Sequence, residues 1–299
     1  MDINYIINIL NEDEPSTSIY FTKKDRYGYT SYSPNVSEEI IGNLITEAQR
    51  YIQNFNDLEI VEYNPTGYID GTLEICSCDY VGNYNEIIGS FDTGNIEDIQ
   101  KEIENFNFYC MDITTENDNI KFFRRVTKFK KLYSKGIIAA FDGNLLNRIN
   151  DKILGMDGEV DIVVLNNASI GVFNHISLER IFKLNDQFQI KASQTLEVIK
   201  ATGVIQNYEI FEEDCLHDKR FQKILTKMLG EEGLNNCFDN FENIIETIEL
   251  FNLDIEIRTI PNKMIIYRDK GQIMDILRLA RDSYYKSTVR EKPGIDNKV

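Results

Sequence analysis

The sequence predicts an α+β protein in two parts, in which small mixed sheets are covered by amphipathic helices. Apolar, β-branched runs at residues 136–144, 159–165 and 169–173 are bounded by Gly, Asn and Asp, as is typical of strands. Asp142-Gly143 is a tight-turn signal between strands. Residues 185–206 carry apolar side chains at helical spacing, so we expect a long helix that covers this sheet.

Charge is distributed unevenly along the chain. Residues 1–119 hold 23 acidic and 5 basic side chains, a net of −18, whereas residues 120–299 hold 26 and 27, a net of +1; the sum is the formal −17 of the chain. The change falls at a polar stretch, residues 114–119. We therefore expect an acidic α+β domain at residues 1–119 and a second α+β domain with a helical C-terminal part at residues 120–299.

In the first part the clearest element is a helix that follows Ser33 and Pro34. Ser33 is the expected N-cap and Pro34 the first helical position, and an apolar stripe then runs from Val36 to Phe55. A short amphipathic helix is expected over residues 1–10. Strands are expected at residues 19–21, 27–30, 58–61, 72–75 and 107–113.

Beyond residue 206 the pattern is mainly helical. Apolar stripes predict helices over Phe221–Met228, Phe241–Phe251 and Ile273–Tyr284. Edge strands are expected at residues 254–257 and 264–267, which Pro261 keeps from being one continuous strand.

Composition places the chain among folded cytoplasmic proteins. A hydrophobic content of 42% and a charged content of 27% argue against disorder. No apolar run approaches the ~20 residues that cross a bilayer, and the N-terminus lacks the basic region of a signal peptide. Five cysteines without framework spacing suit a reducing compartment. No Gly-rich phosphate loop is present, so we expect no cofactor.

A basic aromatic run is the most distinctive short segment. Residues 121–135 carry a local charge of +7 without an acid, from Lys121, Arg124, Arg125, Lys128, Lys130, Lys131 and Lys135. Whether the run is a strand or a helix, several of these cations project together. They suit DNA backbone phosphates rather than base edges. Because the Debye length is ~8 Å at physiological salt, the local patch decides contact and the net charge of the chain mainly slows encounter.

Two further candidates for DNA contact are Arg278 and Arg281, on the outer side of the final helix. The alternative for all these cations is a solvated surface or a dock for the acidic front part. The acidity of that front part is itself a candidate for protein contact, with a cationic partner surface or with a second copy of the chain.

Residues 120–210 resemble the KwaB family of the Kiwa antiphage defence system. The resemblance rests on Phe122-Phe-Arg-Arg125, then Ile137-Ile-Ala-Ala-Phe-Asp-Gly143, then Asp161 in an apolar strand. Ile170 to Asn174 and Leu178-Glu179 with Phe182 follow, and Leu178 stands where a Phe is expected. The resemblance implies a DNA-binding defence protein, a homodimer, that works with a small membrane protein and so reaches the membrane through its partner.

Two other functions remain open on the residues alone. A metal-dependent nuclease would use Asp254, Glu256 and Arg258 with Asp239, although Arg is a poor base. The second alternative is a protein-interaction scaffold without DNA binding. Cys76, Cys78, Cys215 and His217 contain zinc-ligand types, but the spacing within each pair is too short for a usual zinc site, so we predict no metal site and no catalytic residue. Asp161 is either a structural carboxylate or a site residue.

Overall fold

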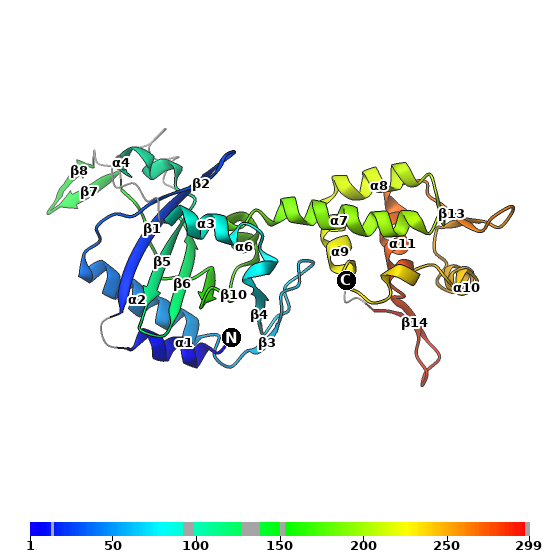
Figure 1. Cartoon of the computed structure of the whole chain (residues 1–299), viewed down its shortest axis with the longest axis horizontal. Helices are drawn as coiled ribbons and strands as arrows, with labels where there is room; N and C mark the ends of the chain where they lie inside the picture. The colour runs from blue at the N-terminus through cyan, green and yellow to red at the C-terminus, as the bar shows by residue number, and fades with distance from the viewer. Residues whose placement is uncertain (13–14, 92–98, 127–137, 150–152, 297–299) are drawn as a thin grey trace. The chain divides into compact units, whose positions relative to one another are not determined.

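The computed structural model describes residues 1–299 apart from 13–14, 92–98, 127–137, 150–152 and 297–299 (Figure 1). Its helices and its mixed sheets confirm the predicted α+β class. The chain divides into two compact units: the first consists of residues 1–63 and 69–184, and the second of residues 64–68 and 185–299.

The first unit is built on one eight-stranded sheet with the strand order β2-β1-β5-β6-β9-β10-β4-β3. Neighbouring strands are antiparallel except β3 and β4, which are parallel. The strands are β1 (Ser16–Asp25), β2 (Gly28–Tyr32), β3 (Glu59–Glu62), β4 (Thr72–Ser77), β5 (Phe108–Thr114), β6 (Asn119–Arg125), β9 (Ile162–Leu165) and β10 (Ser169–Val172). A separate hairpin pairs β7 (Ala139–Asp142) with β8 (Leu145–Arg148), and Gly143 occupies its turn with a φ of 60°.

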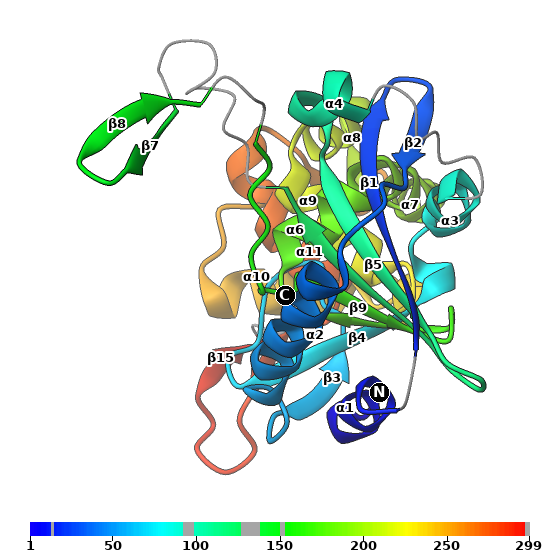
Figure 2. The same ribbon diagram turned by 90° about the vertical axis from the view of Figure 1, so that its left-hand side faces the viewer.

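Helices cover both faces of this sheet because its central strands are apolar on both sides. Phe122 of β6 belongs to the core that contains α1 (Ile3–Leu10) and α2 (Glu38–Gln53). The next residue, Phe123, faces the other way and packs edge-on against Phe182, with ring centroids 5.7 Å apart. That second face is covered by α3 (Tyr84–Phe91) and α6 (His175–Ile181) (Figure 2). Shorter elements are η1 (Cys78–Tyr80), α4 (Ile99–Glu102) and η2 (Ile103–Asn105).

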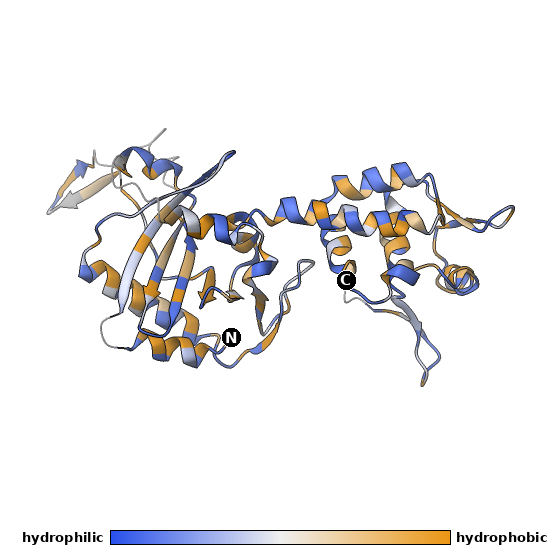
Figure 3. Cartoon of the chain, in the orientation of Figure 1, coloured by the Kyte–Doolittle hydropathy of each residue, from blue (hydrophilic) through white to orange (hydrophobic). Residues whose placement is uncertain are grey.

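The second unit is mainly helical and has its own core. Its helices are α7 (Leu184–Ala201), α8 (Tyr208–His217), α9 (Lys219–Met228), α10 (Phe241–Phe251) and α11 (Ile273–Ala280), with η3 (Leu234–Asn236) and η4 (Lys270–Gln272). A small sheet of β11 (Ile205–Gln206), β13 (Met264–Ile266) and β12 (Glu256–Arg258) and a hairpin of β14 (Tyr284–Lys286) and β15 (Pro293–Ile295) complete it. Hydrophobic and hydrophilic residues alternate around these helices (Figure 3), as expected where one face covers a core.

The division of the chain differs from the predicted boundary at residue 119. Residues 115–118 form the turn of a hairpin in which the N–H of Thr115 donates to the carbonyl of Asp118 at 2.9 Å. On either side, β5 and β6 are paired along seven residues, from Phe108↔Arg125 to Thr114↔Asn119. The charge step therefore lies inside one sheet. Because β5 and β6 are paired central strands of the same sheet, they fold as one unit. A change in net charge between them therefore does not mark a domain boundary.

Two local predictions are wrong. The helix after Pro34 begins at Glu38, and Ser37 is its N-cap, with Oγ accepting from the N–H of Ile40 at 3.4 Å. The long helix α7 was expected to cover the sheet, but its buried Ala192, Leu196 and Ile199 belong to the core of the second unit. The first prediction failed because Ser33 and Ser37 are both N-capping residue types. The second failed because an apolar stripe shows that a helix face is buried but not which core it packs on.

Candidate nucleic-acid interface

The described part of the basic run is strand β6, and its alternation sends successive cations to opposite faces of the sheet. Lys121 and Arg125 share one face, and Arg124 lies on the other. Their cross-strand partners on β5 are, in the same order, Asp112, Phe108 and Tyr109, which alternate between the two faces in the same way. Lys128, Lys130, Lys131 and Lys135 lie outside the described residues. The three cations of β6 therefore have to be assessed one by one.

Lys121 is an interior residue. It is 3% exposed, and its Nζ lies 3.3 Å from Oδ1 of Asp112, its cross-strand partner, and also donates to the side-chain oxygen of Asn119. A buried ammonium needs such a partner because leaving water without one is costly. Lys121 thus neutralises Asp112 inside the sheet and offers no charge to a ligand at the surface.

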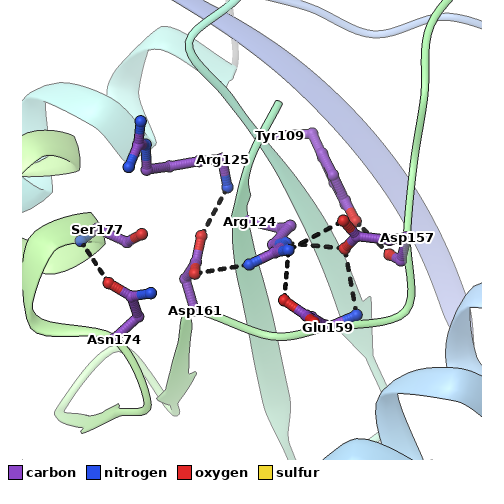
Figure 4. Close-up of polar contacts among 8 residues, drawn as sticks. All are labelled: Tyr109, Arg124, Arg125, Asp157, Glu159, Asp161, Asn174 and Ser177. Carbon is purple, nitrogen blue, oxygen red and sulfur yellow. Dashed lines mark hydrogen bonds and ion pairs between the residues drawn. The ribbon is translucent and has the colours of Figure 1, made fainter. Parts of the chain in front are cut away.

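Arg124 is held by three carboxylates of the segment that leads into β9 (Figure 4). Its Nε and Nη2 donate to Asp157 at 2.8 and 2.9 Å, Nη2 donates to Glu159 at 2.5 Å, and Nη1 donates to Asp161 at 2.9 Å. Burial by itself disfavours the guanidinium charge, but the hydrogen bonds and charges of Asp157 and Asp161 outweigh it, so the pKa of Arg124 is raised. With its side chain 18% exposed, Arg124 is a structural ion-pair centre.

Asp161 joins three parts of the sheet. It is 1% exposed, and its carboxylate accepts from the backbone N–H of Arg125 at 2.8 Å as well as from Arg124. Its backbone carbonyl accepts from the N–H groups of Phe173 and Asn174 at 3.0 and 3.1 Å. The Asn174 side chain then caps α6 by accepting from the N–H of Ser177 at 3.0 Å (Figure 4). These contacts make Asp161 a structural carboxylate.

The segment that carries Asp157 and Glu159 is pressed against α2. Tyr109 of β5 donates its hydroxyl to the carbonyl of Asp157 at 2.9 Å. A Cβ atom at Gly158 would overlap the Cβ of Glu47 on α2, so only glycine fits this approach without a shift of the backbone. The acidic segment is therefore fixed from two sides, and it is placed to receive Arg124.

Arg125 differs from both of its neighbours. Its backbone N–H is bound by Asp161, but its side chain points away from the Arg124 cluster (Figure 4). Within the described ranges, the Arg125 guanidinium has no ion-pair or hydrogen-bond partner, and the residue is partly exposed. It is thus the cation of β6 that remains available to a ligand.

Both arginines predicted on the last helix are paired. Arg278 lies 3.4 Å from Asp275 through Nη1, and that carboxylate also accepts the Tyr284 hydroxyl at 2.8 Å. Arg281 donates through Nε to Glu231 at 2.9 Å and through Nη2 to the other oxygen of the same carboxylate. Their charges are balanced within the second unit.

Helix α9 carries a basic face that the sequence analysis missed. Phe221, Ile224, Leu225 and Met228 are buried, and the cations lie on the outside: Lys219, Arg220, Lys223 and Lys227. The helix contains no acid. The signal was present in the sequence, because positions 220, 223 and 227 share one side of a helix whose apolar stripe had been recognised.

The residues of the nuclease alternative do not form a metal centre. Asp254 is 95% exposed and pairs with Arg268 at 2.7 Å, and Nη2 of Arg258 contacts the sulfur of Met264 at 2.7 Å. In the part of the chain that the structure describes, no group of three or more His, Cys, Asp or Glu residues is arranged to hold a metal ion. The cysteines there are free thiols.

The match to a family model identifies the class of this α+β protein. Residues 103–290 match the family described as Kiwa protein KwaB-like, which spans well over half of the chain. The chain therefore belongs to the KwaB-like family of Kiwa proteins, and the resemblance in the sequence is confirmed; it is accordingly a Kiwa antiphage defence protein. No curated protein and no solved structure matches it. Among the described helices, none is long and apolar enough to cross a membrane.

Proposed function

We propose that this chain acts in antiphage defence by binding the phosphate backbone of DNA without cleaving it, and that a protein partner docks on its acidic front part. The observation that carries the proposal is the uneven pairing of cations. Four of the predicted contact residues are each balanced by a carboxylate: Lys121, Arg124, Arg278 and Arg281. Two basic segments contain no acid at all: the run that starts at Arg125, and α9.

Acid-free basic segments favour a polyanion for an electrostatic reason. Each lysine or arginine that contacts a phosphate releases condensed counterions. The logarithm of the binding constant therefore falls linearly with the logarithm of the salt concentration, with a slope of about −0.9 for each phosphate neutralised. A cation that is already paired contributes less, since its carboxylate repels the phosphate. The proposed contacts are therefore Arg125 with the lysines that follow it in the sequence, and Lys219 and Arg220, which are exposed at the start of α9.

The DNA proposal is tested by fluorescence anisotropy of labelled duplex DNA over a series of salt concentrations. One variant changes Arg125, Lys128, Lys130 and Lys131 to Glu, and a second changes Lys219 and Arg220 to Glu. A control variant that matches the larger of these two changes in net charge changes Arg26, Arg50, Lys101 and Arg180 to Glu. We expect the first two variants to bind at least tenfold more weakly with a flatter salt dependence, and the control to keep the slope of the wild type.

The outcomes distinguish the alternatives. Equal losses in all three variants would mean that only the net charge matters, and no site would then be assigned. Cleavage of the DNA with Mg²⁺ that disappears in Glu256→Gln would replace the proposal with the nuclease alternative. A wild-type chain with no measurable affinity for DNA would leave the scaffold alternative.

The partner proposal rests on the excess of 18 negative charges in residues 1–119, from 23 acidic and 5 basic side chains. Several of these acids are exposed on α2 and on the edge strand β3, including Glu38, Glu39, Glu59 and Glu62. Two partners fit, a small membrane protein with basic cytoplasmic loops or a second copy of the chain. Changing these four residues to Gln in the full chain should slow association, as raised salt should. Unchanged association would refute this role for the acids, both with a protein partner in a pull-down assay and between copies of the chain in sedimentation.

A further inference from the structure

The second unit contains a cavity of about 360 Å³ that the proposed function does not use. It lies between the end of α9, the turn that follows, the first turns of α10 and the end of α11. Small-molecule sites in proteins typically occupy about 300–1,000 Å³. The cavity is therefore large enough for a compact ligand, and the charge and polarity of the lining residues indicate which class of ligand fits.

The walls carry no unbalanced positive charge. Arg281 is bound bidentately by Glu231, and the additional lining carboxylate, Asp282, is exposed. Burial raises the pKa of the lining thiol, Cys237, to about 11, so the thiol is neutral at physiological pH. An anionic ligand would meet a net negative wall, and a cation would find only one carboxylate that is not already paired. These charges favour a neutral ligand.

The polar groups that remain are carboxamides and Nη1 of Arg281, which is buried and has no hydrogen-bond partner among the described residues. Asn240 is occupied, because its side-chain oxygen caps α10 by accepting from the N–H of Asn243. The side chains of Asn236 and Asn243 are exposed and line the cavity, and within the described residues neither has a side-chain hydrogen-bond partner. Each presents a donor and an acceptor side by side in one plane, which is the pattern that pairs with the edge of a nucleobase.

The rest of the lining suits a flat apolar ring. Leu234, Ile244 and Leu279 line the cavity and are buried, as is Tyr284. The Tyr284 hydroxyl is occupied by Asp275 at 2.8 Å, which fixes the tyrosine ring in the wall. The Tyr284 ring also packs against Phe251, with ring centroids 4.7 Å apart, so the wall is a rigid apolar surface against which a heteroaromatic ring can pack.

We propose that this cavity binds a nucleobase in the form of a neutral nucleoside, held edge-on by Asn236 and Asn243 and stacked against the apolar wall. The site is independent of the proposed DNA contacts, since it depends on carboxamides and apolar side chains and not on unpaired cations. Phosphorylation of the ligand should weaken binding because of Glu231 and Asp282.

Cys237 provides a direct readout of occupancy in the full chain. Cys237 and Cys76 are both partly exposed, and Cys76 belongs to the other unit. Burial raises the pKa of Cys76 to about 12 and that of Cys237 to about 11, so both react slowly at neutral pH and faster as the pH rises toward those values. Alkylation by iodoacetamide at about pH 9, followed by peptide mass spectrometry, reports each thiol separately.

We expect adenosine, guanosine, cytidine or uridine to slow the alkylation of Cys237 at least fivefold in a saturable manner and to leave Cys76 unchanged. The corresponding 5′-monophosphates should protect less. Asn236→Leu and Asn243→Leu should each weaken binding about five- to tenfold, the effect of one lost hydrogen-bonding group. Asn235→Leu is the matched control, because Asn235 is exposed on the same short helix and does not line the cavity.

Three results would overturn the proposal. The first is unchanged Cys237 reactivity with every nucleoside. The second is equal or better protection by the monophosphates or by single-stranded DNA, which would assign the cavity to an anionic ligand. The third is protection that survives both Asn→Leu changes in a chain whose thermal unfolding is unaltered.

Discussion

At the scale of single residues, burial decides what each cation of β6 does. Lys121, Arg124 and Arg125 lie within five positions of one another, yet the first is buried against Asp112, the second binds three carboxylates, and the third has a free guanidinium among the described residues. A local count of +7 for residues 121–135 therefore overstates the charge that faces solvent. The pairing of each side chain is what converts a charged sequence into a charged surface.

Arg124→Gln should destabilise the first unit strongly. The change leaves Asp157, Glu159 and the buried Asp161 close together without their common partner, and breaking such a buried pair costs about 3–5 kcal/mol. Urea denaturation measures the loss. Arg125→Gln is the matched control and should change stability by less than about 0.5 kcal/mol, since its side chain is unpaired. Equal stability of the two variants would mean that the Arg124 cluster is not a structural centre.

At the scale of elements, the acidic segment before β9 depends on α2. Its position is set by the close approach of Gly158 to Glu47 and by the hydrogen bond from Tyr109. Only with that segment in place can Asp157 and Glu159 reach Arg124. A helix from the front of the chain thereby positions residues more than one hundred positions later, which is why the front part and the basic run share one unit.

Gly158→Ala should destabilise the protein by about 2 kcal/mol, because the added methyl group forces the segment away from α2. Gly89→Ala on α3 is the control: a Cβ there meets nothing within 4 Å, and alanine is the better helix former by about 0.5–1 kcal/mol. Thermal or urea denaturation of both variants should therefore give shifts of opposite sign. A neutral Gly158→Ala would show that the segment yields easily and that its contact with α2 is loose.

At the scale of the whole molecule, stability resides in two separate cores. The core of the first unit joins α1 and α2 with the sheet, and that of the second joins α7 to α11 with its small strands. A chain cut at residue 119 would lose the strands β1 to β5 and would leave the edge of β6 that pairs with β5 without a partner. A chain cut before α7 keeps the second core intact.

Residues 185–299 alone should fold and unfold cooperatively, with the near-ultraviolet circular dichroism of packed tyrosines, because one contiguous segment supplies that whole core. Residues 120–299 should instead aggregate, owing to the unpaired strand edge. The two fragments are compared by circular dichroism and by size-exclusion chromatography. Cooperative folding of residues 120–299 with a native sheet would restore the boundary expected from charge.

The sequence by itself determined the α+β class, the family and most individual elements of this protein. Strands such as β9 and β10 and helices such as α2 and α10 follow from hydrophobic period and from turn residues, which are local properties. The motifs around Phe122–Arg125 and Leu178–Phe182 were enough to indicate the KwaB-like family, because each motif consists of residues that are close together in the sequence.

Only the tertiary structure decided which charges are free and where the units divide. Lys121 pairs with a residue nine positions away across a hairpin, Arg124 with residues more than thirty positions later, and Arg281 with Glu231 fifty positions earlier. Such pairings depend on strand register and helix packing, which no local pattern specifies. The cavity beside Cys237 also depends on packing, since its walls include residues of three helices, and the apolar stripe of a helix does not specify which other helices it packs against. Composition counts charges, whereas packing determines which of them remain for a ligand.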